Sequence, residues 1–181
     1  MHDVCEPEAL VGAAVMCANI HPHSFHASLI ADISLASDVR KVVTRWLERW
    51  NRPEILDAAV LAVDELFSNA VKHGSQGDQD RVEVTGMCRD TDVRIAVADS
   101  SPCLPVTRKA SVDQESGRGL ALVAAVSDSW GIELSADVLP GKRVWFTVPL
   151  SGLGRSANVD FVKTARQALD SRADDSEGPT A

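Results

Sequence analysis

The stretch DELFSNAVKHG, residues 64–74, ends a long segment in which apolar residues recur at helical spacing. The pattern predicts a helix that begins at Pro53, where a missing N–H is harmless, and ends at the glycine of this stretch. Glu65, Asn69 and His73 are four residues apart, so they form one row along that helix. The row lies immediately beside the apolar face, at the edge of the predicted core.

A carboxylate and a carboxamide one helical turn apart can serve a hydrated cation. The Asn69 oxygen is a suitable Mg²⁺ ligand, and Glu65 can orient or deprotonate a water or hydroxyl group. Lys72 lies at the edge of the same row. The alternative is a solvated helix face, but asparagine is a poor interior helix residue unless its side chain is used.

The composition limits the classes of partner. The chain has 181 residues with 18 basic and 26 acidic side chains, a net charge of −8. This charge argues against direct nucleic-acid binding and against acidic membranes, because such binding depends on clustered cations. The four cysteines have neither zinc-site nor disulfide-framework spacing, and no apolar run is long enough to span a bilayer. We therefore expect a soluble, cytoplasmic protein with free thiols.

Further elements follow from changes in periodicity. We expect a short strand within residues 24–32, a helix from Ser37 as N-cap to Trp50, and a helix over 119–128. Two antiparallel hairpins are expected, one around the turn at 90–92 and one around Pro140-Gly141. Hairpins with helices grouped beside them predict the α+β class, a two-layer α/β sandwich whose mixed, mostly antiparallel sheet has helices on one face.

The chain divides into three parts on the same grounds. Residues 1–25 are expected to form an N-terminal arm, residues 26–150 one folded domain, and residues 151–181 a loosely packed or disordered C-terminal tail. Residues 100–116 form a long loop with little pattern. Loops of this length are often lids or binding segments.

Two more segments support a ligand site beside this row. Asp99 ends a predicted strand beside a turn of small residues, where its carboxylate can accept a hydrogen bond from an exocyclic amine; a turn-stabilising aspartate is the equally weighted alternative. Gly117 and Gly119 flank Arg118 where an apolar helix begins. Backbone N–H groups at such a junction can approach an anion, and the helix N-terminus adds partial positive charge.

Together, the three segments resemble the GHKL (Bergerat-fold) superfamily of ATPases and kinases. ELFSNAVKHG is similar to its N box, residues 99–105 (Asp-Ser-Ser-Pro-Cys-Leu-Pro) stand in the place of its G1 box, and GRGLALV is similar to its G2 box. The resemblance covers about residues 30–150. The short chain is most similar to the stand-alone regulators of actinobacteria that are related to anti-sigma-factor serine/threonine kinases.

This resemblance implies roles and cofactors. ATP and Mg²⁺ would be bound, with Glu65 as the catalytic carboxylate, Asn69 on the metal and Asp99 on the adenine amino group. The residues of the lid-to-helix junction would line the phosphates: Gly117, Arg118, Gly119 and Leu120. Two residues at the end of the N box, Lys72 and His73, would lie near the phosphates or ribose.

The G1 segment departs from the family pattern. Ser101 and Cys103 stand where that box usually has glycines.

The primary hypothesis is a serine/threonine kinase that phosphorylates a small anti-sigma-factor antagonist and also sequesters a sigma factor. The first alternative is a nucleotide-gated interaction module with little turnover. The second is the output half of a split histidine kinase, which the absence of histidine from the helix at 37–50 disfavours. A homodimer through that helix remains open.

Overall fold

The computed structural model describes residues 15–49, 53–75, 77, 80–103, 118–135 and 141–151. Within these residues the elements follow in the order β1 (Val15–Ile20), β2 (Ser24–Ile30), the short 3₁₀ helix η1 (Ile33–Leu35), α1 (Ala36–Glu48), α2 (Pro53–Gly74), β3 (Arg81–Cys88), β4 (Asp92–Asp99), α3 (Arg118–Val126), β5 (Ser129–Ser135) and β6 (Gly141–Pro149).

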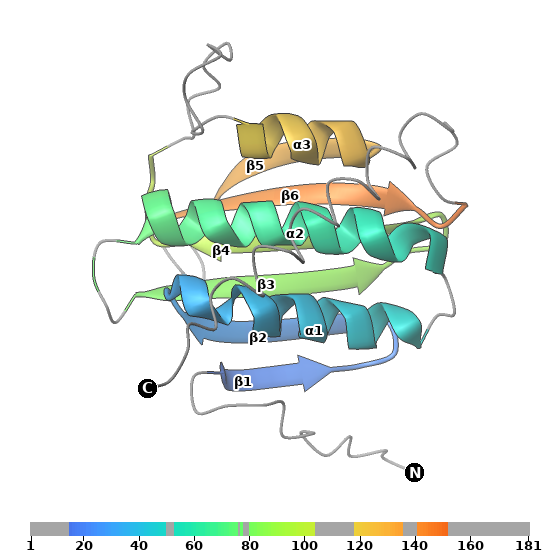
Figure 1. Ribbon diagram of the computed structural model, residues 1–181, viewed down its shortest axis with the longest axis horizontal. Coiled ribbons are helices and arrows are strands. Elements are labelled where there is room, and N and C mark those ends of the chain that lie inside the picture. Colours follow the sequence, from blue (N-terminus) through green and yellow to red (C-terminus); the bar gives the residue numbers. More distant parts are fainter. Residues whose placement is uncertain are drawn as a thin grey trace, which may run out of the picture.

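The strands form one six-stranded sheet in the order β1-β2-β3-β4-β6-β5, and each of its five pairings is antiparallel. The three α-helices lie side by side over one face of this sheet, with α2 between α1 and α3 (Figure 1). The predicted two-layer α+β sandwich is confirmed. The predicted sheet was mixed, but no parallel pairing occurs among the described strands.

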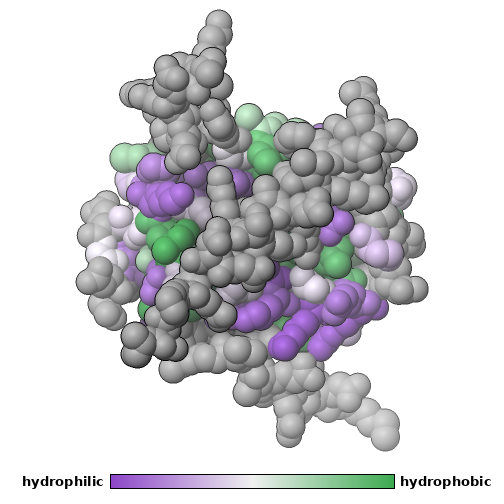
Figure 2. All heavy atoms as spheres, in the orientation of Figure 1, coloured by the Kyte–Doolittle hydropathy of each residue, from purple (hydrophilic) through white to green (hydrophobic). Residues whose placement is uncertain are grey.

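The core lies between the two layers, and α2 passes through its centre. Strand residues of one parity point toward the helices, so β4 buries Val93, Ile95 and Val97 on that side. Phe67 of α2 and Phe146 of β6 are fully buried between the layers. On the surface of the helical layer, the described hydrophilic side chains form broad areas and the apolar ones only small areas (Figure 2). The alternation of apolar and polar residues along the strands therefore determines which face of the sheet packs against the helices.

The predicted hairpins are confirmed as β3–β4 and β5–β6. The helix predicted from Pro53 to Gly74 is confirmed with the same bounds. Strand β2 lies where the first strand was expected. The predicted and observed elements thus agree in the part of the chain that carries the candidate site.

Two details at the N-terminal end differ from expectation. Strand β1 falls in the segment expected to be an arm; it is an edge strand paired by its backbone to β2, and the side-chain pattern did not predict it. Helix α1 begins at Ala36, so Ser37 lies inside it and is not its N-cap. The N-cap of α1 is Leu35, which makes no side-chain cap bond. A side-chain cap occurs instead at the start of η1, where the Asp32 carboxylate accepts a hydrogen bond from the Ser34 backbone N–H.

Candidate functional site

The predicted row of polar residues occupies the C-terminal half of α2. Glu65 and Asn69 are half-buried, whereas Lys72 and His73 in the last turn are exposed. This difference follows from the position of α3, which packs against α2 beside the first two residues. The structure therefore brings a carboxylate and a carboxamide to the junction between two helices.

Gly119, in the first turn of α3, lies directly against this pair. A Cβ atom built on Gly119 would be 2.7 Å from Glu65 Oε2 and 3.0 Å from Asn69 Nδ2. Any side chain at this position would have to displace one of them, so glycine is what permits the close approach of the backbone. The partial positive charge of the α3 N-terminus faces the Glu65 carboxylate. Three of the predicted site residues, from two segments far apart in the chain, thus meet at one place.

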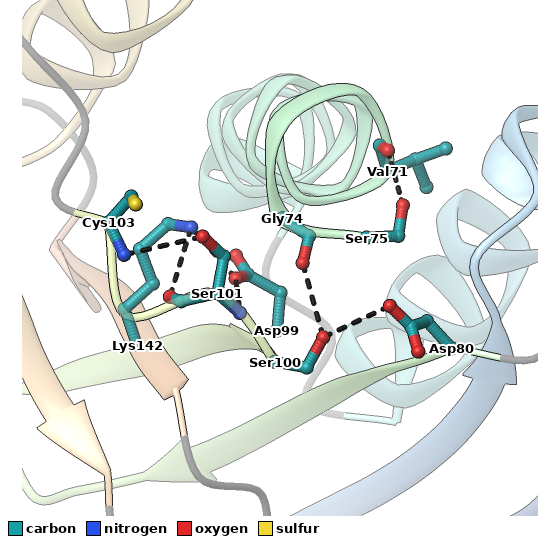
Figure 3. Close-up of polar contacts among 9 residues, drawn as sticks. All are labelled: Val71, Gly74, Ser75, Asp80, Asp99, Ser100, Ser101, Cys103 and Lys142. Carbon is teal, nitrogen blue, oxygen red and sulfur yellow. Dashed lines mark hydrogen bonds and ion pairs between the residues drawn. The ribbon is translucent and has the colours of Figure 1, made fainter. Parts of the chain in front are cut away.

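Asp99 forms the second centre, at the end of β4. Its side chain is only 3% exposed, and its Oδ1 atom accepts hydrogen bonds from the Ser101 backbone N–H at 2.9 Å and from Lys142 Nζ at 2.7 Å (Figure 3). A Cβ atom on Gly74 would lie 2.5 Å from both carboxylate oxygens. The glycine that ends α2 therefore also makes room for the carboxylate that ends β4.

The altered G1 segment has a defined local structure as far as Cys103. The bond from Ser101 N–H to Asp99 is an Asx-type turn, so the turn-stabilising alternative for Asp99 is realised. The buried Ser101 hydroxyl accepts a hydrogen bond from the Cys103 backbone N–H at 3.3 Å. Ser100 Oγ contacts both the Gly74 carbonyl oxygen and Asp80 Oδ2 at 3.2 Å (Figure 3). The two serines of this segment thus fix its turn and tie the end of β4 to the end of α2.

Lys142 is the functional candidate that sequence reasoning missed. It lies at the start of β6, directly opposite Asp99 in the β4–β6 pairing, and its side chain is 6% exposed. A signal was present in the alternation: Lys142 has the same parity as Val144, Phe146 and Val148, which face the core. Because the other residues on this side of the strand are apolar, a lysine there requires a buried partner for its charge.

Other predicted residues are placed only in part. Gly117 lies outside the described residues, as does the stretch 104–116 of the long loop, and only the backbone of Arg118 is described. Leu120 is half-buried and packs against the hydrophobic core. The roles assigned to these residues, and to Lys72 and His73, stay predictions.

The residues at the helix junction fit a magnesium-bound phosphate group. Mg²⁺ prefers oxygen ligands and keeps several water molecules, so it is usually held by one or two protein side chains together with phosphates. Asn69 and Glu65 supply such oxygen atoms, and Gly119 lets the backbone at the start of α3 lie directly against them. Among the described residues no group of three His, Cys, Asp or Glu side chains could hold a metal without such help.

A separate groove of about 600 Å³ lies on the sheet face away from the helices. Arg94 crosses its rim, with its guanidinium 4.1 Å from the Trp145 ring and 2.6 Å from Glu133 Oε1. None of the predicted site residues is among its described lining residues. The groove and the candidate site are therefore different surfaces.

Comparison with known proteins agrees with the superfamily resemblance. Residues 29–148 match the family model of the histidine kinase-like ATPase domain, which supports the GHKL superfamily resemblance and, with it, ATP binding. The chain is also similar to an uncharacterized protein of Streptomyces coelicolor, with 35% identity over 75 residues, which cover 40% of this chain and 70% of that protein. None of the described helices is long and apolar enough to cross a membrane.

Proposed function

The chain belongs to the histidine kinase-like ATPase domain family, and we propose that it is an ATP-binding regulatory protein that phosphorylates serine or threonine on a small antagonist protein. The observation that carries this proposal is the meeting of Glu65, Asn69 and Gly119 at the α2–α3 junction. The same chain would also sequester a sigma factor.

The chemistry required is mainly positioning and charge neutralisation. Phosphoryl transfer passes through a loose transition state, so a protein catalyses it by aligning the acceptor and stabilising charge. Glu65 would orient the acceptor hydroxyl and take its proton. Asn69 would hold the Mg²⁺ that accompanies ATP and neutralises phosphate charge. The N-terminus of α3 would face the phosphates, because its backbone N–H groups favour anions.

The remaining predicted residues would bind the rest of the nucleotide. Asp99 would accept a hydrogen bond from the adenine amino group. Arg118 and its neighbours Gly117 and Leu120 would line the phosphates, and Lys72 and His73 would lie near the phosphates or ribose. The exposure of the last two fits a role at the open edge of such a site.

The partner surface is proposed on α1. Its polar residues include Lys41, Arg45 and Glu48, which could contact a sigma factor, an antagonist or a second copy of the chain. We place this activity in the cytoplasm, where sigma factors act.

The first test is titration calorimetry of the full chain with Mg-ATP. We expect saturable binding that is weakened at least tenfold by each of two substitutions. Asn69→Ala removes the proposed Mg²⁺ ligand, and Asp99→Asn removes the charged acceptor for the adenine amino group. Met87→Ala, on the opposite face of the sheet, is the matched control and should bind as the wild type does. Absence of saturable binding at millimolar nucleotide would overturn the proposal.

Transfer is tested separately from binding. With γ-labelled ATP and an extract of the native cells, the wild type should label serine or threonine in a small protein. Glu65→Gln should bind ATP but lose the labelling, because the amide cannot take the proton of the acceptor. Equal labelling by the wild type and Glu65→Gln would remove Glu65 from the catalytic role.

The second candidate function is a nucleotide-gated interaction module without turnover. The ordered serines of the G1 segment and the Asp99–Lys142 pair favour it, since they tie α2, β4 and β6 together where the base would bind. Such a module would bind its partner differently with and without nucleotide. Equal partner affinity in both states would exclude it.

A further inference from the structure

We propose that Lys142 recognises the nucleobase together with Asp99, by donating a hydrogen bond to N1 of adenine. This inference rests on the proposed function, since it assigns a further binding residue to the same nucleotide site. The sequence alone pointed only to Asp99 for base recognition.

The geometry of the pair is the starting observation. Lys142 and Asp99 are directly opposite each other on β6 and β4, and Lys142 Nζ lies 2.7 Å from Asp99 Oδ1. Both side chains are almost fully buried, at 6% and 3% exposed. A buried ion pair of this kind adds little to stability compared with apolar residues of the same size. Its presence at the predicted base site is better explained by recognition.

Counting donors and acceptors shows what the pair can offer to a ligand. A lysine ammonium has three donors, and among the described residues two are directed at Asp99 Oδ1 and, at 3.5 Å, at the Ser101 carbonyl oxygen. The hydrogen bonds that described residues donate to Asp99 both fall on Oδ1. Counted over the part of the chain that the structure describes, one ammonium donor of Lys142 and the Oδ2 atom of Asp99 are left for a ligand.

Adenine has the complementary pair on one edge. Its exocyclic amino group is a donor and the adjacent ring atom N1 is an acceptor. With the amino group on Asp99 and N1 on Lys142, both polar groups of the base edge would be satisfied in a buried site, as burial of polar groups requires. Gly74 keeps the space beside the carboxylate free of a side chain.

The test is a calorimetric titration of the full chain with three magnesium nucleotides: ATP, 1-deaza-ATP, which lacks the N1 acceptor, and 7-deaza-ATP, which changes the ring away from this edge. Because the lysine donor is charged, we expect wild-type affinity for 1-deaza-ATP to be about tenfold lower than for ATP. The affinity for 7-deaza-ATP should stay within about threefold, since no bond proposed here involves that atom.

Substitution of the lysine separates recognition from a structural role. In Lys142→Met the preference for ATP over 1-deaza-ATP should disappear. A lysine that only neutralises Asp99 would weaken both nucleotides equally when substituted and leave their ratio unchanged. Because Lys142→Met leaves a buried carboxylate unpaired, the doubly neutral variant Asp99→Asn/Lys142→Met is measured beside it, after circular dichroism has shown that each is folded.

The outcomes separate this inference from the function on which it rests. Equal wild-type affinity for ATP and 1-deaza-ATP overturns the role of Lys142 and leaves ATP binding intact. A preference that persists in the folded lysine variants also overturns it. If none of the three nucleotides binds, the proposed function fails and this inference fails with it.

Discussion

Single glycines determine how closely the backbone approaches the site. Gly119 brings the start of α3 against Glu65 and Asn69, and Gly74 does the same for Asp99. In both cases the backbone can approach the polar side chains because glycine has no Cβ atom, and not because glycine is flexible. At this scale a methyl group is enough to change the geometry of a carboxylate.

Gly119→Ala should reduce ATP turnover at least tenfold while the domain stays folded. The added Cβ would lie 2.7 Å from Glu65 Oε2, so the carboxylate or the helix must shift, and displacements of about 1 Å near a reacting group can reduce rates a hundredfold. The measurement is steady-state turnover, with circular dichroism for the fold. Gly77→Ala is the control, since a Cβ there meets nothing within 4 Å. Wild-type turnover in Gly119→Ala would show that Glu65 can accommodate the added methyl group without loss of activity.

At the scale of elements, a partly buried ion pair connects helices α1 and α2. Arg40 Nη1 lies 2.9 Å from Asp64 Oδ1, and the two side chains are 20% and 7% exposed. On the outer surface of α1, Lys41 pairs with Asp38 at 3.0 Å, but the lysine is 51% exposed. Both pairs join a basic side chain to an aspartate, and they differ in how far the two side chains are buried.

Arg40→Met should therefore destabilise the domain by about 2 kcal/mol, because it leaves the buried Asp64 charge without this partner. Lys41→Met should change the free energy of unfolding by less than about 0.5 kcal/mol, as is usual for exposed pairs. Urea unfolding of both variants measures the difference. Equal effects would mean that burial does not distinguish them.

The junction before α1 should make stability depend on pH. The hydrogen bond from the Ser34 backbone N–H lowers the pKa of Asp32 below its ordinary value of 3.8. A lowered folded-state pKa adds stability above pH 3.8, and that contribution is lost as the pH falls through the folded-state value.

Asp32→Ala should accordingly lower Tm at neutral pH, and its Tm should converge with that of the wild type as the pH is reduced below 3.8. Thermal unfolding at several pH values measures this. A Tm difference independent of pH would mean that the charge of Asp32 is not involved.

At the scale of the whole molecule, a single core joins the two layers. The helices cover one face of the sheet, and the buried residues from α1, α2 and the central strands form one hydrophobic cluster (Figure 1). Because α2 contributes to this core along one side and to the candidate site along another, the site depends on the integrity of the entire sandwich.

Phe67→Ala tests that dependence. Phe67 is fully buried in α2, and its truncation should cost about 3–5 kcal/mol through lost burial and the cavity that remains. Unfolding followed by far-ultraviolet circular dichroism and by tryptophan fluorescence should give one shared transition in the variant. Met87→Ala, at a position 56% exposed on β3, should change stability by less than about 0.5 kcal/mol. Separate transitions for the two probes would show that the layers are not one cooperative unit.

The sequence by itself predicted most of the described elements and the row of polar residues on α2. Periodicity gave α2 its bounds and placed Glu65 and Asn69 in one row, because side-chain direction within a helix is a local property. The three boxes were sufficient to identify the superfamily. The early edge strand β1 was missed because backbone pairing, not side-chain alternation, holds it.

Only the tertiary structure decided which distant residues meet. The register of β4 with β6 sets Lys142 opposite Asp99, 43 residues away, and the packing of α3 on α2 brings Gly119 to Glu65. Such contacts depend on how whole elements align, and a shift of one residue in a strand would turn Lys142 to the other face of the sheet. Local pattern therefore predicted Asp99 at the end of its strand, and the sheet register supplied its partner, Lys142.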